Sequence, residues 1–226
     1  MEHLVRDPAH RTRVYYLKAE GMEEAFKVTV TLRARMVKKR IQGVKRDFID
    51  AATTKCVGLD CEFTNPRKKK AGEEQRATVL QLSVASETLV FQIIHADIKV
   101  PRVLKDFLED GNIRFCGAAI GNDVKKLRLK GIHINSTYDL QKVVPNPTTK
   151  TTPSIYDLEN HTIGTNLEQK KYKHKKKMDV TAQEKEDELI FGWTNYLLSY
   201  EQVHYAALDA HLGFEIARKH WMLVGY

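Results

Sequence analysis

The sequence predicts one α/β domain whose sheet begins antiparallel and continues with a parallel strand. Three apolar, β-branched runs follow one another at 56–63, 78–85 and 89–94, which indicates an antiparallel start to the sheet. A helical apolar face at 103–108 and a strand-like run at 113–119 then indicate a crossover to a parallel strand. With 226 residues and 42% hydrophobic content, the chain is long enough to bury the core of such a domain.

The chain before the first acidic motif divides into three stretches. Residues 1 to about 24 are polar and aperiodic, so we expect a loose N-terminal tail. Apolar and polar residues alternate over 26–33, which predicts a half-buried strand. Four apolar residues then recur at helical spacing and predict an amphipathic helix: Val37, Ile41, Val44 and Phe48. The lysines and arginines around them form either a solvated face or a contact for a phosphate backbone.

The strand at 56–63 carries an acidic pair near its end. Because side chains alternate along a strand, Asp60 and Glu62 point to one face and Cys61 points to the other. Two neighbouring carboxylates resist ionising together unless a cation lies between them. The pair is therefore either a chance Asp-x-Glu on a strand edge or part of a site for a hard divalent metal, which prefers oxygen ligands.

Two further carboxylates and a tyrosine occupy positions that suit a site. Asp123 follows the strand at 113–119 and begins a helix, where α/β sheets place ligands, although an acidic first-turn residue is also common elsewhere. The last helix carries an apolar stripe over 203–221, and Tyr205 and Asp209 share a face beside it. A carboxylate beside such a stripe is partly buried, which is costly unless it is paired or binds a metal.

Charge and composition favour an intracellular protein with a polyanionic partner. The chain has 37 Lys and Arg against 29 Asp and Glu, a net charge of +8, which favours nucleic acid first and an acidic membrane surface second. Its three cysteines form neither a disulfide framework nor a zinc pattern. No run is apolar enough to span a membrane, and the N-terminus lacks the apolar core of a secretory signal. We expect the nucleus, the cytoplasm or both.

A lysine-rich segment lies between the second and third acidic motifs. Residues 168–188 are low in apolar content and change from a run of lysines to a run of acidic residues. Such a segment is typical of an exposed, mobile insertion. Its lysines are either solvated, in contact with nucleic acid, or a nuclear address.

Three blocks of the sequence, in order, resemble the exonuclease motifs of the DEDD 3′–5′ exonucleases. They are VGLDCEF at 57–63, GAAIGNDVKKL at 117–127 and LSYEQVHYAALDA at 198–210. The similarity covers roughly residues 26–222. It resembles in particular the DEDDy branch, typified by the Werner-syndrome-protein exonuclease domain, and the plant stand-alone members of that group. The DEDDh branch carries a histidine where Tyr205 stands here.

The resemblance implies a ribonuclease-H-like fold, a mixed β-sheet flanked by helices, with a single exonuclease domain over 25–226. It also implies two bound Mg²⁺ or Mn²⁺ ions. Asp60 would bridge both ions, Glu62 and Asp209 would complete the ligands of the first, and Asp123 would hold the second. Tyr205 would orient the attacking water. Paired ions of this kind clamp a phosphodiester and lower the pKa of bound water.

The expected function is a metal-dependent 3′–5′ exonuclease that releases nucleoside monophosphates from single-stranded or partly unwound 3′ ends of RNA or DNA. With no second recognisable domain, the chain would act alone or as a homo-oligomer, away from membranes. Two alternatives remain, a catalytically silent nucleic-acid-binding or scaffold protein on the same fold and an endonuclease of the RNase H type. The choice between RNA and DNA depends on contacts to the 2′-OH, which these motifs do not specify.

Overall fold

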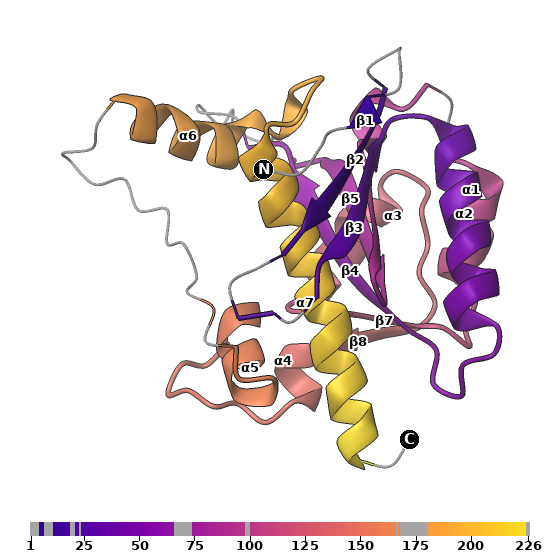
Figure 1. Cartoon of the computed structure of the whole chain (residues 1–226), viewed down its shortest axis with the longest axis vertical. Coiled ribbons are helices and arrows are strands. Elements are labelled where there is room, and N and C mark those ends of the chain that lie inside the picture. The colour runs from indigo at the N-terminus through magenta and orange to yellow at the C-terminus, as the bar shows by residue number, and fades with distance from the viewer. Residues whose placement is uncertain are drawn as a thin grey trace.

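The fold is built on one mixed sheet that runs through the centre of the molecule (Figure 1). A computed structural model describes residues 5–6, 11–18, 21–22, 24–65, 74–97, 100–165, 167 and 180–224, without the side chains of 5–6, 180–183, 185 and 186. The described strands form an eight-stranded sheet in the order β1-β2-β3-β6-β5-β4-β7-β8. Their bounds are β1 Val5–Arg6, β2 Thr12–Leu17, β3 Phe26–Thr31, β4 Cys56–Phe63, β5 Ala77–Val84, β6 Glu87–Phe91, β7 Arg114–Gly117 and β8 Thr137–Asp139.

Helices cover both faces of this sheet. The long helix α7 lies across one face, and α1 and α2 lie on the opposite face (Figure 1). The α-helices are α1 Ala34–Val44, α2 Arg102–Glu109, α3 Gly121–Arg128, α4 Leu140–Val143, α5 Ile155–Thr162, α6 Val180–Phe191 and α7 Tyr200–Val224. A π-helical turn, η1 Lys45–Ile49, follows α1, and two 3₁₀ turns are η2 Ile93–His95 and η3 Gly192–Thr194.

The strand directions confirm the predicted order of pairing. β4, β5 and β6 form an antiparallel meander, as three successive apolar runs indicated. α2 then crosses over, and β7 lies parallel to β4 on its other side. β8 extends the parallel edge beside β7. β4 is therefore a central strand, flanked by β5 and β7, and its residues are held in place from both sides.

The prediction of a loose tail over 1–24 is wrong for its central part. Residues 12–17 form β2, which pairs antiparallel with β3 along its whole length and buries Tyr15 and Leu17. Four of its six residues are apolar, but Val14, Tyr15, Tyr16 and Leu17 follow one another without alternation, so no period-2 pattern marks the strand. The remainder of this tail, apart from the short β1 and residues 11, 18, 21–22 and 24, lies outside the described residues.

The same strand explains why β3 is more buried than the alternating pattern predicted. With β2 on one side and β6 on the other, β3 is an interior strand. Its polar residues Thr29 and Thr31 are as buried as Val28 and Val30, so the half-buried prediction is wrong. On the α7 side, the ring of Phe26 stacks on His211 at 4.0 Å between centroids.

The amphipathic helix after β3 forms as predicted but ends in a π-helical turn. Val37 and Ile41 are buried, as their spacing required. The π turn adds a residue before the next inward position, so Ile49 is buried and Phe48 is 37% exposed. The prediction that Phe48 joins the buried face is therefore wrong, because a 3.6-residue repeat cannot anticipate a five-residue hydrogen-bonded turn.

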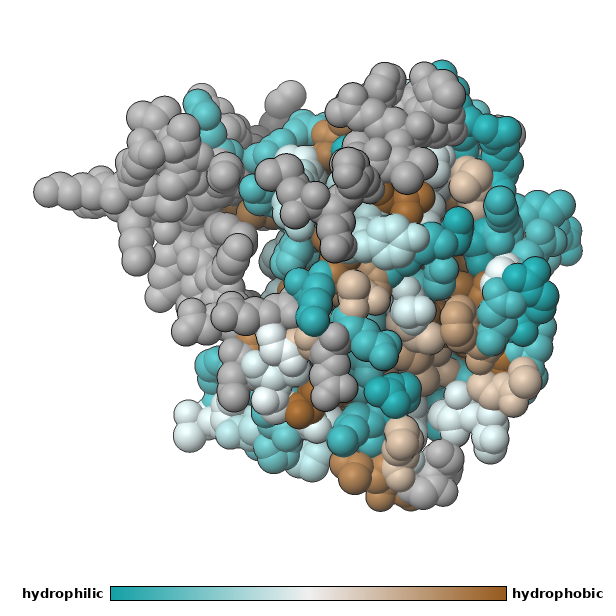
Figure 2. Space-filling view, viewed as in Figure 1, coloured by the Kyte–Doolittle hydropathy of each residue, from teal (hydrophilic) through white to brown (hydrophobic). Residues whose placement is uncertain are grey.

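On the face shown in Figure 2, the surface of the described residues is mostly hydrophilic. Figure 2 shows small, separate hydrophobic areas, one of them where α7 ends at the exposed residues Met222, Leu223 and Val224.

None of the helices in the described part of the chain is long and apolar enough to cross a membrane. Of the lysine-rich segment 168–188, residues 168–179 lie outside the described residues, and 180–188 belong to α6.

Candidate active site

Asp60 and Glu62 project from the central strand towards α7. Gly58, two residues earlier on the same face, lies so close to α7 that a Cβ there would stand 1.9 Å from the carbonyl oxygen of Ala210. Because residues two apart in a strand share a face, Asp60 and Glu62 lie on this α7 side. Cys61 points to the opposite face and is buried, as predicted. Both carboxylates remain half-buried, so solvent reaches them.

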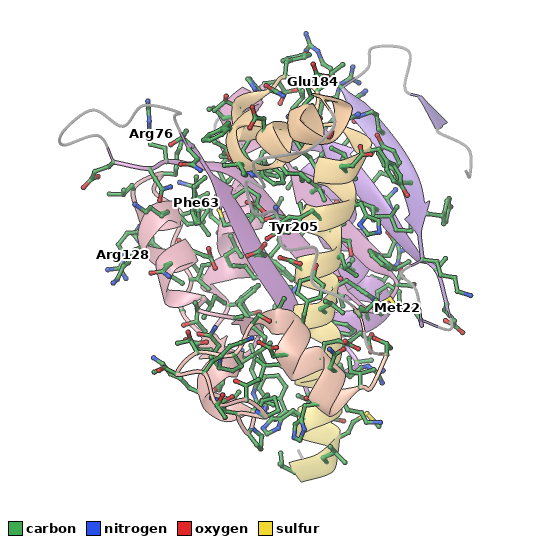
Figure 3. The ribbon with its side chains drawn as sticks, turned by 90° about the vertical axis from the view of Figure 1, so that its left-hand side faces the viewer. Met22, Phe63, Arg76, Arg128, Glu184 and Tyr205 are labelled. Atoms are coloured by element: carbon green, nitrogen blue, oxygen red, sulfur yellow. The ribbon has the colours of Figure 1, made fainter. Side chains whose placement is uncertain are left out.

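Helix α7 brings Tyr205 and Asp209 to the same place. Its first turn is fixed by Ser199 and Gln202, whose side chains accept hydrogen bonds from each other's backbone N–H at 3.3 and 3.1 Å. The helix then packs on β4 through two glycines. A Cβ added to Gly213 on the helix would lie only 3.7 Å from the Cα of Gly58 on the strand. Figure 3 shows Tyr205 on α7, beside the strand that ends at Phe63.

Asp123 approaches from a third element. It lies in the first turn of α3, just after β7, and is 6% exposed. The turn between β7 and α3 is tight, because Ala119 has a positive φ of 55° and its N–H donates to Asp139 at 3.0 Å. Asp139, at the end of β8, also stands near enough to raise the pKa of Asp123. The sheet thus gathers Asp123 and Asp139 beside the end of β4.

The four predicted carboxylates interact with one another. Burial raises the pKa of Asp60 to about 6, and burial together with the Asp60 charge raises the pKa of Asp209 to about 8 and of Asp123 to about 9. Burial and the charges of Asp60, Asp209 and Asp123 raise the pKa of Glu62 well above its ordinary value. The charge of Asp60 raises the pKa of each of the other three carboxyls, so Asp60 is the central member of the cluster.

Two tyrosines hold the Asp209 carboxylate. The Tyr156 hydroxyl donates to Asp209 Oδ1 at 2.9 Å, and hydrogen bonds from Tyr156 and Tyr205 lower the pKa of Asp209, against the effect of burial. The pKa of the Tyr205 hydroxyl is itself raised, first by the Asp209 charge and then by burial. Tyr205 therefore stays protonated at neutral pH and serves as a hydrogen-bond donor.

Tyr156 is a residue of the site that the sequence interpretation missed. It lies on α5, which packs beside α7. A local signal does mark the start of α5: Ser154 and Asp157 form a capping box, in which each side chain accepts from the other's backbone N–H. That signal predicts a helix at this point, but it does not show that the helix faces Asp209, because the two segments are 53 residues apart.

The donor set suits a divalent cation with oxygen ligands. Among the described residues, no lysine or arginine forms an ion pair with any of the four carboxylates. Nor are any three described His, Cys, Asp or Glu side chains already grouped closely enough to hold an ion by themselves. Mg²⁺ and Mn²⁺ need only a few carboxylates, because water and substrate phosphate oxygens complete their ligands. The chemistry of the cluster therefore fits such ions.

Comparison with known proteins assigns the fold and the family. Residues 40–223 match a family model described as 3′-5′ exonuclease. The chain belongs to the 3′–5′ exonuclease family. The matched region includes β4, α3 and α7, and with them all five predicted site residues. A search of curated proteins finds no match.

Solved structures of other exonucleases share the fold of this family member. Trypanosoma brucei RNase D, in a complex with GMP, gives a TM-score of 0.65 at 14% identity, covering 88% of this chain and 57% of that one. Escherichia coli RNase D, an exoribonuclease involved in structured RNA processing, gives 0.62 at 16%, covering 85% and 44%. The EXO domain of Aedes aegypti Nibbler gives 0.59 at 13%, covering 87% and 89%. The predicted ribonuclease-H-like architecture, a mixed sheet flanked by helices, is confirmed.

Proposed function

We propose that this member of the family is an active 3′–5′ exonuclease of the DEDDy type that depends on Mg²⁺ or Mn²⁺. It hydrolyses phosphodiester bonds at the 3′ ends of RNA or DNA and releases nucleoside monophosphates. The observation that carries the proposal is the convergence of Asp60, Glu62, Asp123 and Asp209, four buried or half-buried carboxylates in which the charge of Asp60 raises the pKa of the other three. Such a cluster is destabilising unless a cation compensates it.

The carboxylates would hold the ions in the arrangement that the motifs imply. Asp60 would bridge two ions, Glu62 and Asp209 would complete the first set of ligands, and Asp123 would serve the second. When bound, paired ions lower the pKa of water and stabilise the oxygen that leaves. The contribution of the chain would be to bring these four carboxylates together from three separate elements, β4, α3 and α7.

Tyr205 would position the reacting water. Its hydroxyl donates to Asp209 and keeps its proton at neutral pH, because a neighbouring carboxylate disfavours a phenolate. A protonated hydroxyl orients a water molecule but does not accept its proton. Tyr156, bonded to the same carboxylate, would keep Asp209 in one orientation while Tyr205 acts.

The proposed substrate is a nucleic acid with an accessible 3′ end. The net charge of +8 favours a polyanion, and the Escherichia coli relative named above is an exoribonuclease. We further propose that the protein is similar to the plant stand-alone members of the DEDDy group and that it acts as a monomer or homo-oligomer. We also propose that it is located in the nucleus or the cytoplasm.

The test is the direction and unit of degradation. With Mg²⁺ or Mn²⁺, a 5′-labelled oligonucleotide should shorten one nucleotide at a time from its 3′ end, and Asp60→Ala should abolish this while retaining the wild-type circular dichroism spectrum. Matched RNA and DNA oligonucleotides, single- and double-stranded, show which substrate is preferred. A single internal cut would indicate an endonuclease. Absence of cleavage on every substrate would favour the catalytically silent binding protein.

A further inference from the structure

Gln81, in the middle of β5, has a buried side chain that no described residue satisfies. The residue is fully buried, with an exposed fraction of 0%. Both its amide nitrogen and its amide oxygen lack a hydrogen-bond partner among the described residues. Each unmade hydrogen bond of a buried polar group costs about 1–3 kcal/mol. A methionine or leucine would fill the same space without this cost, so the amide calls for a role beyond packing.

Gln81 lies directly beside the central carboxylate of the candidate site. In the antiparallel pair of β4 and β5, Gln81 stands opposite Asp60. Directly opposite residues point to the same face, with Cβ atoms about 4.5–5.5 Å apart. The side chain of Gln81 therefore lies on the α7 side, next to Asp60. The contact of Ser83 with His211 of α7, at 3.3 Å, confirms that this face of β5 looks towards α7.

The surroundings of Gln81 leave Asp60 as its natural partner. On the other side of Gln81, the opposite residue on β6 is Val90, which is apolar. Along β5, Ser83 already shares a hydrogen bond with Thr88, and Val79 is apolar. Two strand residues span about the same length as one helical turn, so the part of α7 nearest to Gln81 lies about one turn before His211. Ala206 and Ala207 lie there, and both are buried and too small to compete for the amide.

We propose that Gln81 is a positioning residue for Asp60: when the cation site is filled, the Gln81 side chain turns so that its amide N–H, unpartnered here among the described residues, donates to the Asp60 carboxylate and fixes the direction in which that carboxylate presents its other oxygen. The amide oxygen is left to accept a hydrogen bond from water in the site. Asp60 interacts with every other carboxylate of the cluster, so its orientation affects the whole site. This inference rests on the proposed function.

The test replaces the amide by an apolar side chain of similar size. In Gln81→Met, the metal-free protein should unfold at or above the wild-type temperature, because two unsatisfied polar atoms are removed. Its affinity for Mn²⁺, measured by calorimetry, and its kcat should each fall by about 10–100-fold, the usual effect of removing a group that orients a metal ligand. Gln81→Leu, which also removes the donor without adding a titratable group, should lose as much.

Thr29→Val is the matched control. Thr29 is also fully buried, and its hydroxyl has no hydrogen-bond partner in the described part of the chain, but it lies on β3, two strands from β5. This variant should keep the wild-type Mn²⁺ affinity and kcat. Wild-type Mn²⁺ affinity in Gln81→Met, or in Gln81→Leu should Gln81→Met not fold, would overturn the role of Gln81 alone. If the wild type neither binds Mn²⁺ nor degrades nucleic acid, the proposed function itself fails.

Discussion

The contact between Gly58 and α7 sets the distance between the two halves of the candidate site. Asp60 and Glu62 lie on β4, and Tyr205 and Asp209 lie on α7. A methyl group at position 58 would stand 1.9 Å from the carbonyl oxygen of Ala210 and 2.6 Å from the backbone nitrogen of Phe214. Both neighbours are backbone atoms, which cannot rotate away as a side chain can. In Gly58→Ala, α7 must therefore retreat from β4.

The size of this displacement gives the expected effects. Cβ atoms essentially never approach other heavy atoms within 3.0 Å, so the contact must open by about 1 Å. Forcing an extra methyl group into a packed contact costs about 1–3 kcal/mol, which lowers Tm by roughly 2–12 °C in a domain of this size. A displacement of about 1 Å in a catalytic group lowers turnover by about 100-fold.

The assay compares two glycine variants by thermal unfolding and by kcat on a 5′-labelled oligonucleotide at a temperature well below both transitions. Gly43, inside α1 on the other face of the sheet, has no atom within 4 Å of the position that an added methyl group would take. Gly43→Ala should raise stability by about 0.5–1 kcal/mol through its higher helix propensity, with unchanged kcat. The reasoning is refuted if Gly58→Ala retains wild-type kcat, or if Gly43→Ala loses activity to the same extent.

Two further predictions concern other parts of the molecule. Tyr205→Phe should lower kcat by about 10–100-fold with little change in KM, because the hydroxyl positions a reacting group while the ring keeps its packing against Trp193; an unchanged kcat would remove Tyr205 from the site. Burial and the charge of Arg218 lower the pKa of His211 from 6.5 to about 4, so the unfolded chain takes up a proton first as the pH falls. The difference in unfolding free energy between wild type and His211→Gln should therefore shrink by up to about 3 kcal/mol between pH 7 and pH 4. A difference independent of pH would show that His211 is not buried as a neutral group.

The sequence predicted best what depends on local periodicity. The alternation that places Asp60 and Glu62 on one face, and the spacing that places Tyr205 and Asp209 together, both follow from strand and helix geometry. Which carboxylates meet across the fold is a different matter: Asp60 and Asp209 are 149 positions apart, and only the ordered resemblance of three motifs linked them. Tyr156, Asp139 and Gln81 carry no such motif, and their proximity to the site emerges from tertiary packing.

The errors have equally specific causes. β2 was missed because its four apolar residues, Val14 to Leu17, are consecutive and do not alternate with polar ones. Because β2 was missed, β3 was predicted to be half-buried. With β2 beside it, β3 is an interior strand of the sheet. In the π turn η1, the buried position falls on Ile49 and not on Phe48. A regular helical repeat cannot predict this shift of one residue.

The central claim, that Asp60, Glu62, Asp123 and Asp209 form one divalent-cation site, is tested most directly by measuring proton release when Mn²⁺ binds. The raised pKa values of Asp209, about 8, and Asp123, about 9, mean that these carboxyls hold protons at pH 7.5 without a cation. Binding must displace them, since the ligands of a metal are deprotonated. Calorimetry in buffers of different ionisation enthalpy should show release of about one proton or more in the wild type and greatly weakened binding in Asp60→Asn. Mn²⁺ binding that releases no protons, or that is unchanged in Asp60→Asn, would contradict the account.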